Sequence, residues 1–213
     1  MAHEIQNFTF QNPTKILFGR NRIEDIDNEI PKDAKVLVLY GGGSVKKNGA
    51  FDRAVKALGD REWDEFSGIE ANPTFEILMK AVEKVRAGNF TYLLAIGGGS
   101  VIDGTKFVSA ASLFTEDPVD LFGWGVGKGL PVQEVVPFGT ILTLPATGSE
   151  MNSGAVITLV EKKAKVSFRG SKTFPVFSVL EPELTYTLPV RQLVNGLLDT
   201  YIHVMENYLT YPV

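Results

Sequence analysis

The chain has 213 residues, of which 44% are hydrophobic and 22% charged, and it contains no cysteine. This composition is typical of a folded globular protein, and it excludes disulfides and thiolate metal ligands, so that any metal must be bound by His, Asp or Glu. The net charge of −4 disfavours a general nucleic-acid surface or an anionic membrane as a partner, because both need a basic face. We therefore expect small-molecule partners, with no nucleic acid and no membrane.

Short β-branched and aromatic runs alternate with amphipathic stretches along residues 8–179. The runs predict strands at 15–18, 36–39, 92–96, 138–144 and 176–180. The stretches between them predict helices at 23–29, 49–58, 76–87 and 101–113, where apolar residues recur three and four apart. Such alternation is typical of βα units around a mostly parallel sheet, so the sequence predicts an α/β fold.

The composition changes near Thr185. Pro189 stands where the first turn of a helix would begin, and helical periodicity then continues through Leu193 to Leu209. A lone helix after an α/β domain predicts the start of a second unit. We therefore divide the chain into residues 1–184 and residues 185–213. No window approaches the roughly 18 apolar residues of a membrane span, and no basic leader opens the chain, so we expect a cytoplasmic protein.

The sequence GGGS occurs twice, at residues 41–44 and 97–100, each time after a predicted strand. Ligands of open α/β sheets bind at the carboxyl ends of strands, where glycine lets the backbone approach a phosphate and the next helix presents unpaired N–H groups. Two such turns on one sheet predict a dinucleotide. The third glycine of GxGxxG is absent, so the common fingerprint is not present. A plain tight turn is the alternative, which the duplication disfavours.

The first glycine turn also bears on the choice of dinucleotide. No acid follows the strand where one would bind the ribose hydroxyls of NAD, whereas Lys46 and Lys47 lie just beyond the turn. A 2′-phosphate is tolerated there, so the sequence favours NADP(H) over NAD. The alternative is that both lysines belong to a solvated helix start.

A polar loop, TLPATGSEMNSG (residues 143–154), follows a later strand. Thr143, Thr147, Ser149 and Asn152 are compact hydrogen-bonding residues suited to phosphate or ribose oxygens. Alone, such a cluster is more often an ordinary polar loop with a helix cap at Ser149. It gains meaning beside the two glycine turns.

Asp199 and His203 lie four residues apart on the last predicted helix and so share one face. An imidazole and a carboxylate so placed can bind a divalent metal. The spacing alone favours the other interpretation, a helix-surface contact or a capped core histidine.

These motifs together resemble the iron-containing alcohol dehydrogenases, in particular the NADPH-dependent butanol dehydrogenase and aldehyde reductase branch. The resemblance runs from about residue 7 to the end, through NPTKILFGR, YGGGSVKKNG, IGGGSVIDGTK, LPATGSEMNSGAV, EPELTYTLP and NGLLDTYIHVMENYLTYPV. It implies a Rossmann-like parallel sheet with flanking helices that binds NADP, followed by the first helix of an all-α metal domain that is otherwise missing.

The resemblance also implies roles for particular residues. The implied NADP site consists of Gly41, Gly42, Ser44, Gly98, Gly99, Ser100, Asp103, Thr143, Thr147, Ser149, Asn152 and Lys165. Asp199 and His203 match the first two metal ligands, for Fe²⁺ or Zn²⁺. The implied reaction is metal-assisted hydride transfer between an alcohol or aldehyde and the nicotinamide. A homodimer that forms through residues 8–18 is also implied.

The chain departs from the family in its histidines. Two further metal-binding histidines are expected on later helices, but the sequence contains only His3 and His203. We therefore expect a truncated enzyme of doubtful activity whose last helix is exposed. The rival hypothesis is a non-catalytic NADPH-binding fragment, and a weaker third is sugar-phosphate chemistry on the related dehydroquinate-synthase and glycerol-dehydrogenase scaffold. Glu181 stands where the family more often has Asp.

Overall fold

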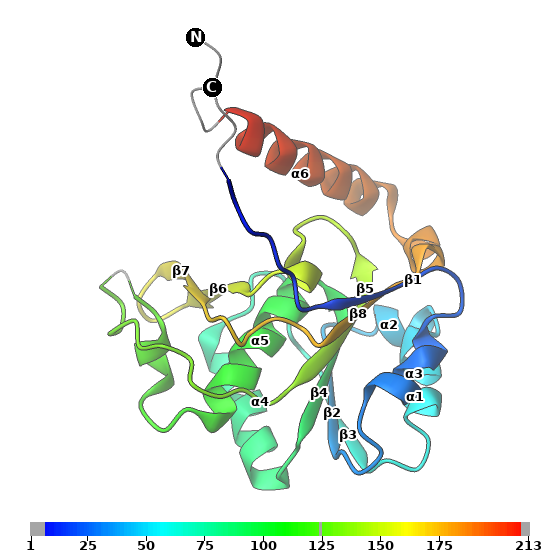
Figure 1. Ribbon diagram of the computed structural model, residues 1–213, viewed down its shortest axis with the longest axis horizontal. Coiled ribbons are helices and arrows are strands. Elements are labelled where there is room, and N and C mark those ends of the chain that lie inside the picture. The colour runs from blue at the N-terminus through cyan, green and yellow to red at the C-terminus, as the bar shows by residue number, and fades with distance from the viewer. Residues whose placement is uncertain (1–6, 124, 210–213) are drawn as a thin grey trace.

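The computed structural model describes residues 7–123 and 125–209, and its centre is a six-stranded parallel sheet (Figure 1). The strands follow the order β1-β8-β5-β4-β2-β3 across the sheet. Their bounds are β1 Lys15–Phe18, β2 Val36–Tyr40, β3 Trp63–Phe66, β4 Tyr92–Gly98, β5 Phe138–Leu144 and β8 Phe177–Leu180. The predicted parallel sheet is confirmed, with β3 as an edge strand that the sequence pattern did not predict.

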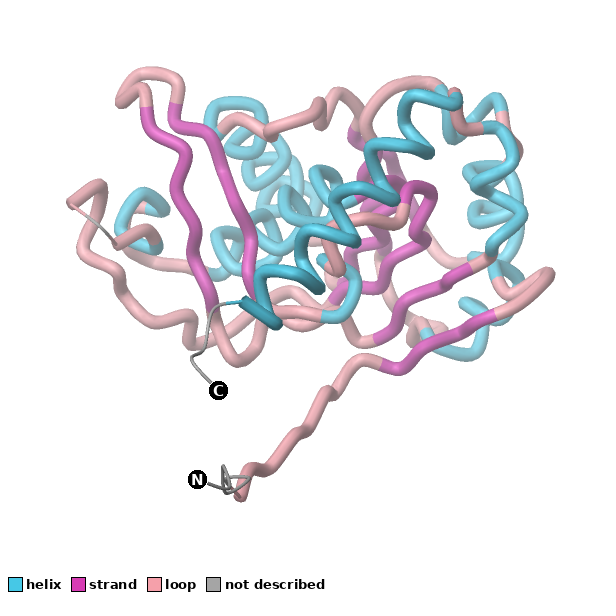
Figure 2. Tube along the Cα trace, turned by 90° about the horizontal axis from the view of Figure 1, so that it is seen from above, coloured by secondary structure: helices cyan, strands magenta, loops and turns pink. Residues whose placement is uncertain are grey.

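Helices cover both faces of this sheet (Figures 1 and 2). α4 and α5 lie on one face, and α1 to α3 lie on the other. The bounds are α1 Ile26–Glu29, α2 Ser44–Lys47, α3 Ala50–Leu58, α4 Phe75–Gly88 and α5 Gly99–Leu113, with short 3-10 turns η1 Ile23–Asp25, η2 Pro118–Leu121, η3 Ser149–Met151 and η4 Pro182–Thr187. The predicted helix at 23–29 is thus a 3-10 turn that continues into α1.

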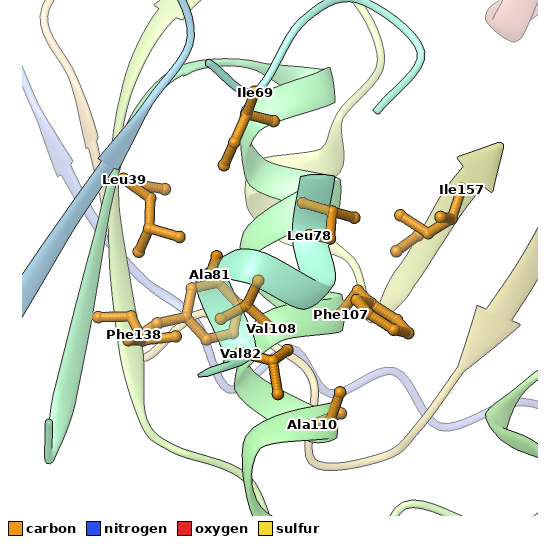
Figure 3. Close-up of a cluster of buried hydrophobic side chains, with 14 of the residues drawn as sticks. Leu39, Ile69, Leu78, Ala81, Val82, Phe107, Val108, Ala110, Phe138 and Ile157 are labelled. Carbon is orange, nitrogen blue, oxygen red and sulfur yellow. The ribbon is translucent and has the colours of Figure 1, made fainter. Parts of the chain in front are cut away.

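The central strands are buried on both faces, which explains their continuous apolar runs. In β2, Leu37 and Leu39 pack into the core under α4 and α5, whereas Val36 and Val38 pack into the core under α1 and α3. α5 is buried along most of its length, and Figure 3 shows its Phe107 within the first of these cores. α5 is therefore fixed in place by its packing before any ligand binds.

A two-stranded antiparallel hairpin packs beside α5. It consists of β6 Gly154–Leu159 and β7 Ala164–Arg169. Ala155 and Ile157 of β6 and Phe168 of β7 join the core on the α5 side. The sequence pattern did not predict this hairpin, because a charged turn at residues 161–163 interrupts the apolar runs. Strand β6 makes most of the hairpin's contacts with α5.

The last helix, α6 Val190–Leu209, stands away from the sheet (Figures 1 and 2). Within the described part of the helix, only Gly196 is buried, and a Cβ there would lie 2.8 Å from the carbonyl oxygen of Pro145. Most of its large apolar side chains are exposed: Val190, Leu193, Val194, Leu197, Leu198, Tyr201, Ile202, Val204, Tyr208 and Leu209. The predicted helix and its exposure are confirmed, while the division into two domains at residue 185 stays a prediction.

The edge strand β1 continues an extended N-terminal segment with exposed aromatic side chains, Phe8 and Phe10. The dimer predicted through residues 8–18 stays a prediction. His3 lies outside the described residues. No described helix is long and apolar enough to cross a membrane.

Gly139 offers a test of the sheet packing. A Cβ at this position in β5 would lie 2.2 Å from the ring of Phe177 in β8. We expect Gly139→Ala to lower the free energy of unfolding by about 1–3 kcal/mol, because overpacking forces the ring or the strand to shift. Urea denaturation measures this change. Gly123→Ala is the control, since the nearest atom to its Cβ is 4.0 Å away, and equal loss in both variants would contradict the packing argument.

Candidate functional site

Two cavities open near the carboxyl ends of β2, β4 and β5. The larger has a volume of about 580 Å³ and the smaller about 300 Å³. The larger is lined by Gly99, Ser100, Asp103, Thr147, Ser149, Asn152, Lys165, Asp199 and His203 among others. The smaller is lined by Gly41, Gly42, Ser44, Gly98 and Thr143 among others. Every residue predicted for the site therefore borders one of these two cavities, and the Gly98–Gly99 turn separates them.

The second glycine turn joins β4 to α5. The register between β4 and β5 shifts at Gly97 and Gly98, where the strand leaves the sheet. A Cβ on Gly99 would lie 2.4 Å from the hydroxyl oxygen of Thr147. Glycine is thus required at position 99, because residues 147–154 approach the backbone closely there. Gly99 and Ser100, the first residues of α5, also line the larger cavity, so the N-terminus of the helix faces it.

The first glycine turn joins β2 to α2 and borders the smaller cavity. A Cβ on Gly41 would lie 2.8 Å from the carbonyl oxygen of Ile69, whereas Gly42 and Gly43 face open space. The ammonium of Lys46 lies 2.8 and 3.0 Å from the two carboxylate oxygens of Glu65. This hydrogen bond raises the pKa of Lys46. A contact between Lys46 and a 2′-phosphate therefore stays a prediction, with Glu65 as the group that would compete for it.

Side chains from several elements bind the backbone of residues 147–154. The hydroxyl of Ser178 in β8 donates to the backbone carbonyl of Glu150 at 2.7 Å. The hydroxyl of Thr173 donates to the backbone carbonyl of Ser153 at 2.6 Å. The amide of Asn12 donates to the carbonyl of Met151 at 2.7 Å. The sheet and the neighbouring segments thus hold this loop in one conformation.

Lys106 anchors the loop through three hydrogen bonds, and no role was predicted for it from the sequence. Its ammonium is fully buried and donates to the Ser149 hydroxyl at 2.8 Å, the Asn152 side-chain oxygen at 2.9 Å and the Gly154 carbonyl at 2.8 Å. Burial lowers the pKa of Lys106 to about 8. A lysine within the apolar run of α5, three residues after Asp103, was the signal that could have indicated a buried partner.

Asp103 lies on the cavity side of the same helix. Its carboxylate accepts a hydrogen bond of 2.5 Å from the Ser149 hydroxyl and one of 2.9 Å from the N–H of Val156. Burial raises the pKa of Asp103, and the bond from Ser149 opposes that rise. Ser149 therefore connects Asp103 to Lys106, and much of its hydrogen-bonding capacity is used within the protein.

Cationic side chains line the β7 side of the larger cavity. The ammonium of Lys165 donates to the side-chain oxygen of Asn72 at 2.8 Å. Arg169 lies next to Gly154, where a Cβ would be 3.8 Å from its Nε. Lys165 and Arg169 are both exposed along one face of β7, so they add positive charge opposite the start of α5.

Asp199 and His203 border the larger cavity from α6. The His203 Nδ1 lies 4.0 Å from a carboxylate oxygen of Asp199, and the side chains of His203 and Asp199 are about half exposed, at 48% and 44%. Across residues 7–123 and 125–209, no group of three or more His, Asp or Glu residues is placed to hold a metal ion. The donor types suit Fe²⁺ or Zn²⁺, but two ligands do not complete a catalytic metal site.

A family model described as iron-containing alcohol dehydrogenase matches residues 13–182. The chain belongs to this family. The resemblance drawn from the sequence motifs is therefore confirmed, as is the Rossmann-like sheet with its flanking helices.

Individual relatives agree with this result. The chain is 48% identical over 211 residues to the NADPH-dependent aldehyde reductase YqhD of Escherichia coli, and the match covers 98% of this chain and 54% of that protein. It is 42% identical to the probable NADH-dependent butanol dehydrogenase 1 of Bacillus subtilis, covering 96% of this chain and 52% of the relative. The chain thus spans about half the length of these relatives.

Solved structures give the same picture for the fold. The NADH-dependent butanol dehydrogenase A of Thermotoga maritima superposes with a TM-score of 0.90 at 40% identity, over 96% of this chain and 52% of that structure. The cofactor-free structure of Escherichia coli YqhD superposes with a TM-score of 0.88 at 46% identity, over 98% of this chain and 53% of that structure.

The burial of Asp103 has a consequence for pH dependence. Because its pKa is raised above 3.8, the folded state keeps a proton that the unfolded state has lost, and this contribution to stability falls as pH rises through the raised pKa. We expect Asp103→Asn to remove that contribution. Urea denaturation at several pH values from about 2.5 to about 7, a range that includes both sides of 3.8, measures the difference from wild type.

Asp120 provides a control of opposite sign. A hydrogen bond from Lys128 lowers its pKa, so its contribution is present above the ordinary value of 3.8 and is lost as pH falls. The stability difference between wild type and Asp120→Asn should shrink toward acid pH, whereas that for Asp103→Asn should shrink toward neutral pH. Parallel pH profiles in the two variants would contradict the assignment.

Proposed function

We propose that this chain is the cofactor-binding part of an NADP(H)-dependent oxidoreductase that interconverts primary alcohols and aldehydes. The observation that carries the proposal is the meeting of both glycine turns and residues 147–154 around two adjoining cavities at the carboxyl ends of the strands. Relatives named as an NADPH-dependent aldehyde reductase and as butanol dehydrogenases support the same chemistry. A homodimer and a boundary at residue 185 are part of this proposal.

The proposed cofactor lies across both cavities. Its pyrophosphate binds at Gly98, Gly99 and Ser100, where the N-terminus of α5 offers unpaired N–H groups. The other proposed contacts are Gly41, Gly42, Ser44, Asp103, Thr143, Thr147, Ser149, Asn152 and Lys165. No acid stands in the first glycine turn, and this supports NADP(H) over NAD(H).

The proposed reaction transfers hydride between the nicotinamide and the carbonyl carbon of the substrate. Asp199 and His203 are the ligands that we propose for an Fe²⁺ or Zn²⁺ ion, which when bound acts as a Lewis acid on the substrate oxygen. The role that we propose for this chain is to bind the dinucleotide and to hold its nicotinamide end near α6. Hydride transfer needs that orientation to be fixed, and the anchoring of residues 147–154 supports it.

A non-catalytic NADPH-binding role is the second candidate. Among the described residues no more than two candidate metal ligands lie together, and this favours the non-catalytic role. Under this role the chain binds NADPH with the same glycine turns but does not reduce aldehydes. The two candidates differ in turnover and share cofactor binding.

NADPH binding tests the shared part of both candidates. Titration of NADPH fluorescence with the chain should show saturable binding, tighter than that of NADH. Gly42→Val should weaken NADPH binding by about tenfold or more, equivalent to about 1.4 kcal/mol, because the new side chain enters the smaller cavity. A Cβ at Gly42 would meet no atom within 4 Å beyond its chain neighbours, so the fold should tolerate the change.

Gly43→Val is the matched control. Its Cβ also faces open space, but Gly43 does not line the cavity, so NADPH affinity should stay near that of wild type. Butanal reduction with added Fe²⁺ or Zn²⁺ then separates the two candidates, because turnover favours the oxidoreductase and binding without turnover favours the non-catalytic role. No NADPH binding by the wild-type chain would contradict both.

A further inference from the structure

Lys106 holds the only ammonium that is fully buried among the described residues. A buried charge is costly unless partners surround it, and a lysine ammonium has three donors. Here each of the three has its own acceptor, all between 2.8 and 2.9 Å away. A methionine would fill similar space without this cost, so packing alone does not explain a lysine at this position.

The three acceptors come from the loop that lines the larger cavity. Ser149 lies at the start of η3, Asn152 follows it, and Gly154 begins β6. The same Asn152 side chain also accepts from the N–H of Gly154 at 2.9 Å and donates to the carbonyl of Gly148 at 2.9 Å. One ammonium thus ties both ends of the short turn 149–154 to α5.

We infer that Lys106 is a positioning residue, which holds residues 147–154 against α5 in the conformation that binds the phosphate-bearing cofactor. The identity of the ligand rests on the proposed function. Through Ser149, whose hydroxyl lies 2.5 Å from the carboxylate of Asp103, Lys106 also fixes that side chain. Through the loop it keeps Thr147 packed on Gly99, at the N-terminus of α5.

The charged groups around Lys106 set its response to pH. Asp103 from α5 and Glu150 from η3 favour the charged form, whereas Arg169 from β7 and burial disfavour it, and burial dominates. The pKa of Lys106 is lowered to about 8, so the ammonium loses a proton over a range in which a phosphate monoester stays fully ionised. A neutral amine has only two donors for three acceptors, and the loop is then held less firmly.

The test compares wild type with Lys106→Met and with the control Lys128→Met. Lys128 forms an exposed ion pair with Asp120 at 2.6 Å and lines neither cavity. Hydrogen exchange on the ligand-free chains should show faster exchange at residues 147–154 in Lys106→Met alone, with β2 and β4 protected as in wild type. NADPH affinity should fall by about tenfold or more, the size expected for loss of a charged hydrogen-bonding partner.

The wild-type chain gives an independent measurement if Lys106→Met does not fold. The NADPH affinity of the wild-type chain should fall several-fold between pH 7 and pH 9, and the affinity of Lys128→Met should fall in parallel. If Lys106→Met does fold, its NADPH affinity should not change over the same pH range. Unchanged exchange at residues 147–154 in a folded Lys106→Met, or a wild-type affinity that does not change with pH over this range, would overturn the inference.

Failure of the proposed function gives a different pattern. If the wild-type chain binds no NADPH, the proposed function and the ligand named here are both wrong. The exchange experiment needs no ligand, so it still decides whether Lys106 holds the loop.

Discussion

The buried ammonium of Lys106 is the interaction on which the candidate site depends. It joins the helix that follows the second glycine turn to the loop that follows β5, through three hydrogen bonds of 2.8 to 2.9 Å. Without it, each of the three acceptors would lose one hydrogen bond in a largely buried setting, although the Asn152 oxygen would keep its bond from the N–H of Gly154, and such losses are costly. The loop is also held from the sheet by Ser178 and from the N-terminal segment by Asn12. The larger cavity therefore has walls that are formed before a ligand arrives.

The glycines of the two turns serve the packing of the protein as well as access for a ligand. Gly99 is required because Thr147 approaches it, and Gly41 is required because the backbone of Ile69 approaches it. Gly42 and Gly43 face open space, and Gly42 alone of these two borders a cavity. A glycine-rich turn at a strand end thus combines close contacts between segments with a small surface where a ligand can approach the backbone.

The sequence predicted the sheet well because its central strands are buried on both faces and read as continuous apolar runs. Strand β3 was missed because Trp63, Asp64 and Glu65 lie at an exposed edge and show no such run. The β6–β7 hairpin was missed because its charged turn hides the alternation. Residues of the candidate site could be placed near strand ends from their motifs, but the bonds that Ser149 and Asn152 make with Lys106 depend on a contact across more than 40 residues. No local pattern contains that information.

We propose that the second glycine turn and residues 147–154 form one cofactor site. Amide resonances of the ¹⁵N-labelled chain, followed during titration with NADPH, test it most directly. We expect the largest shifts at residues 41–44, 97–103 and 147–154, with little change in α3, α4 and β3. Saturable binding with shifts confined to other surfaces would contradict this proposed site, because the cofactor would then bind away from the cavities that Lys106 and the glycine turns form.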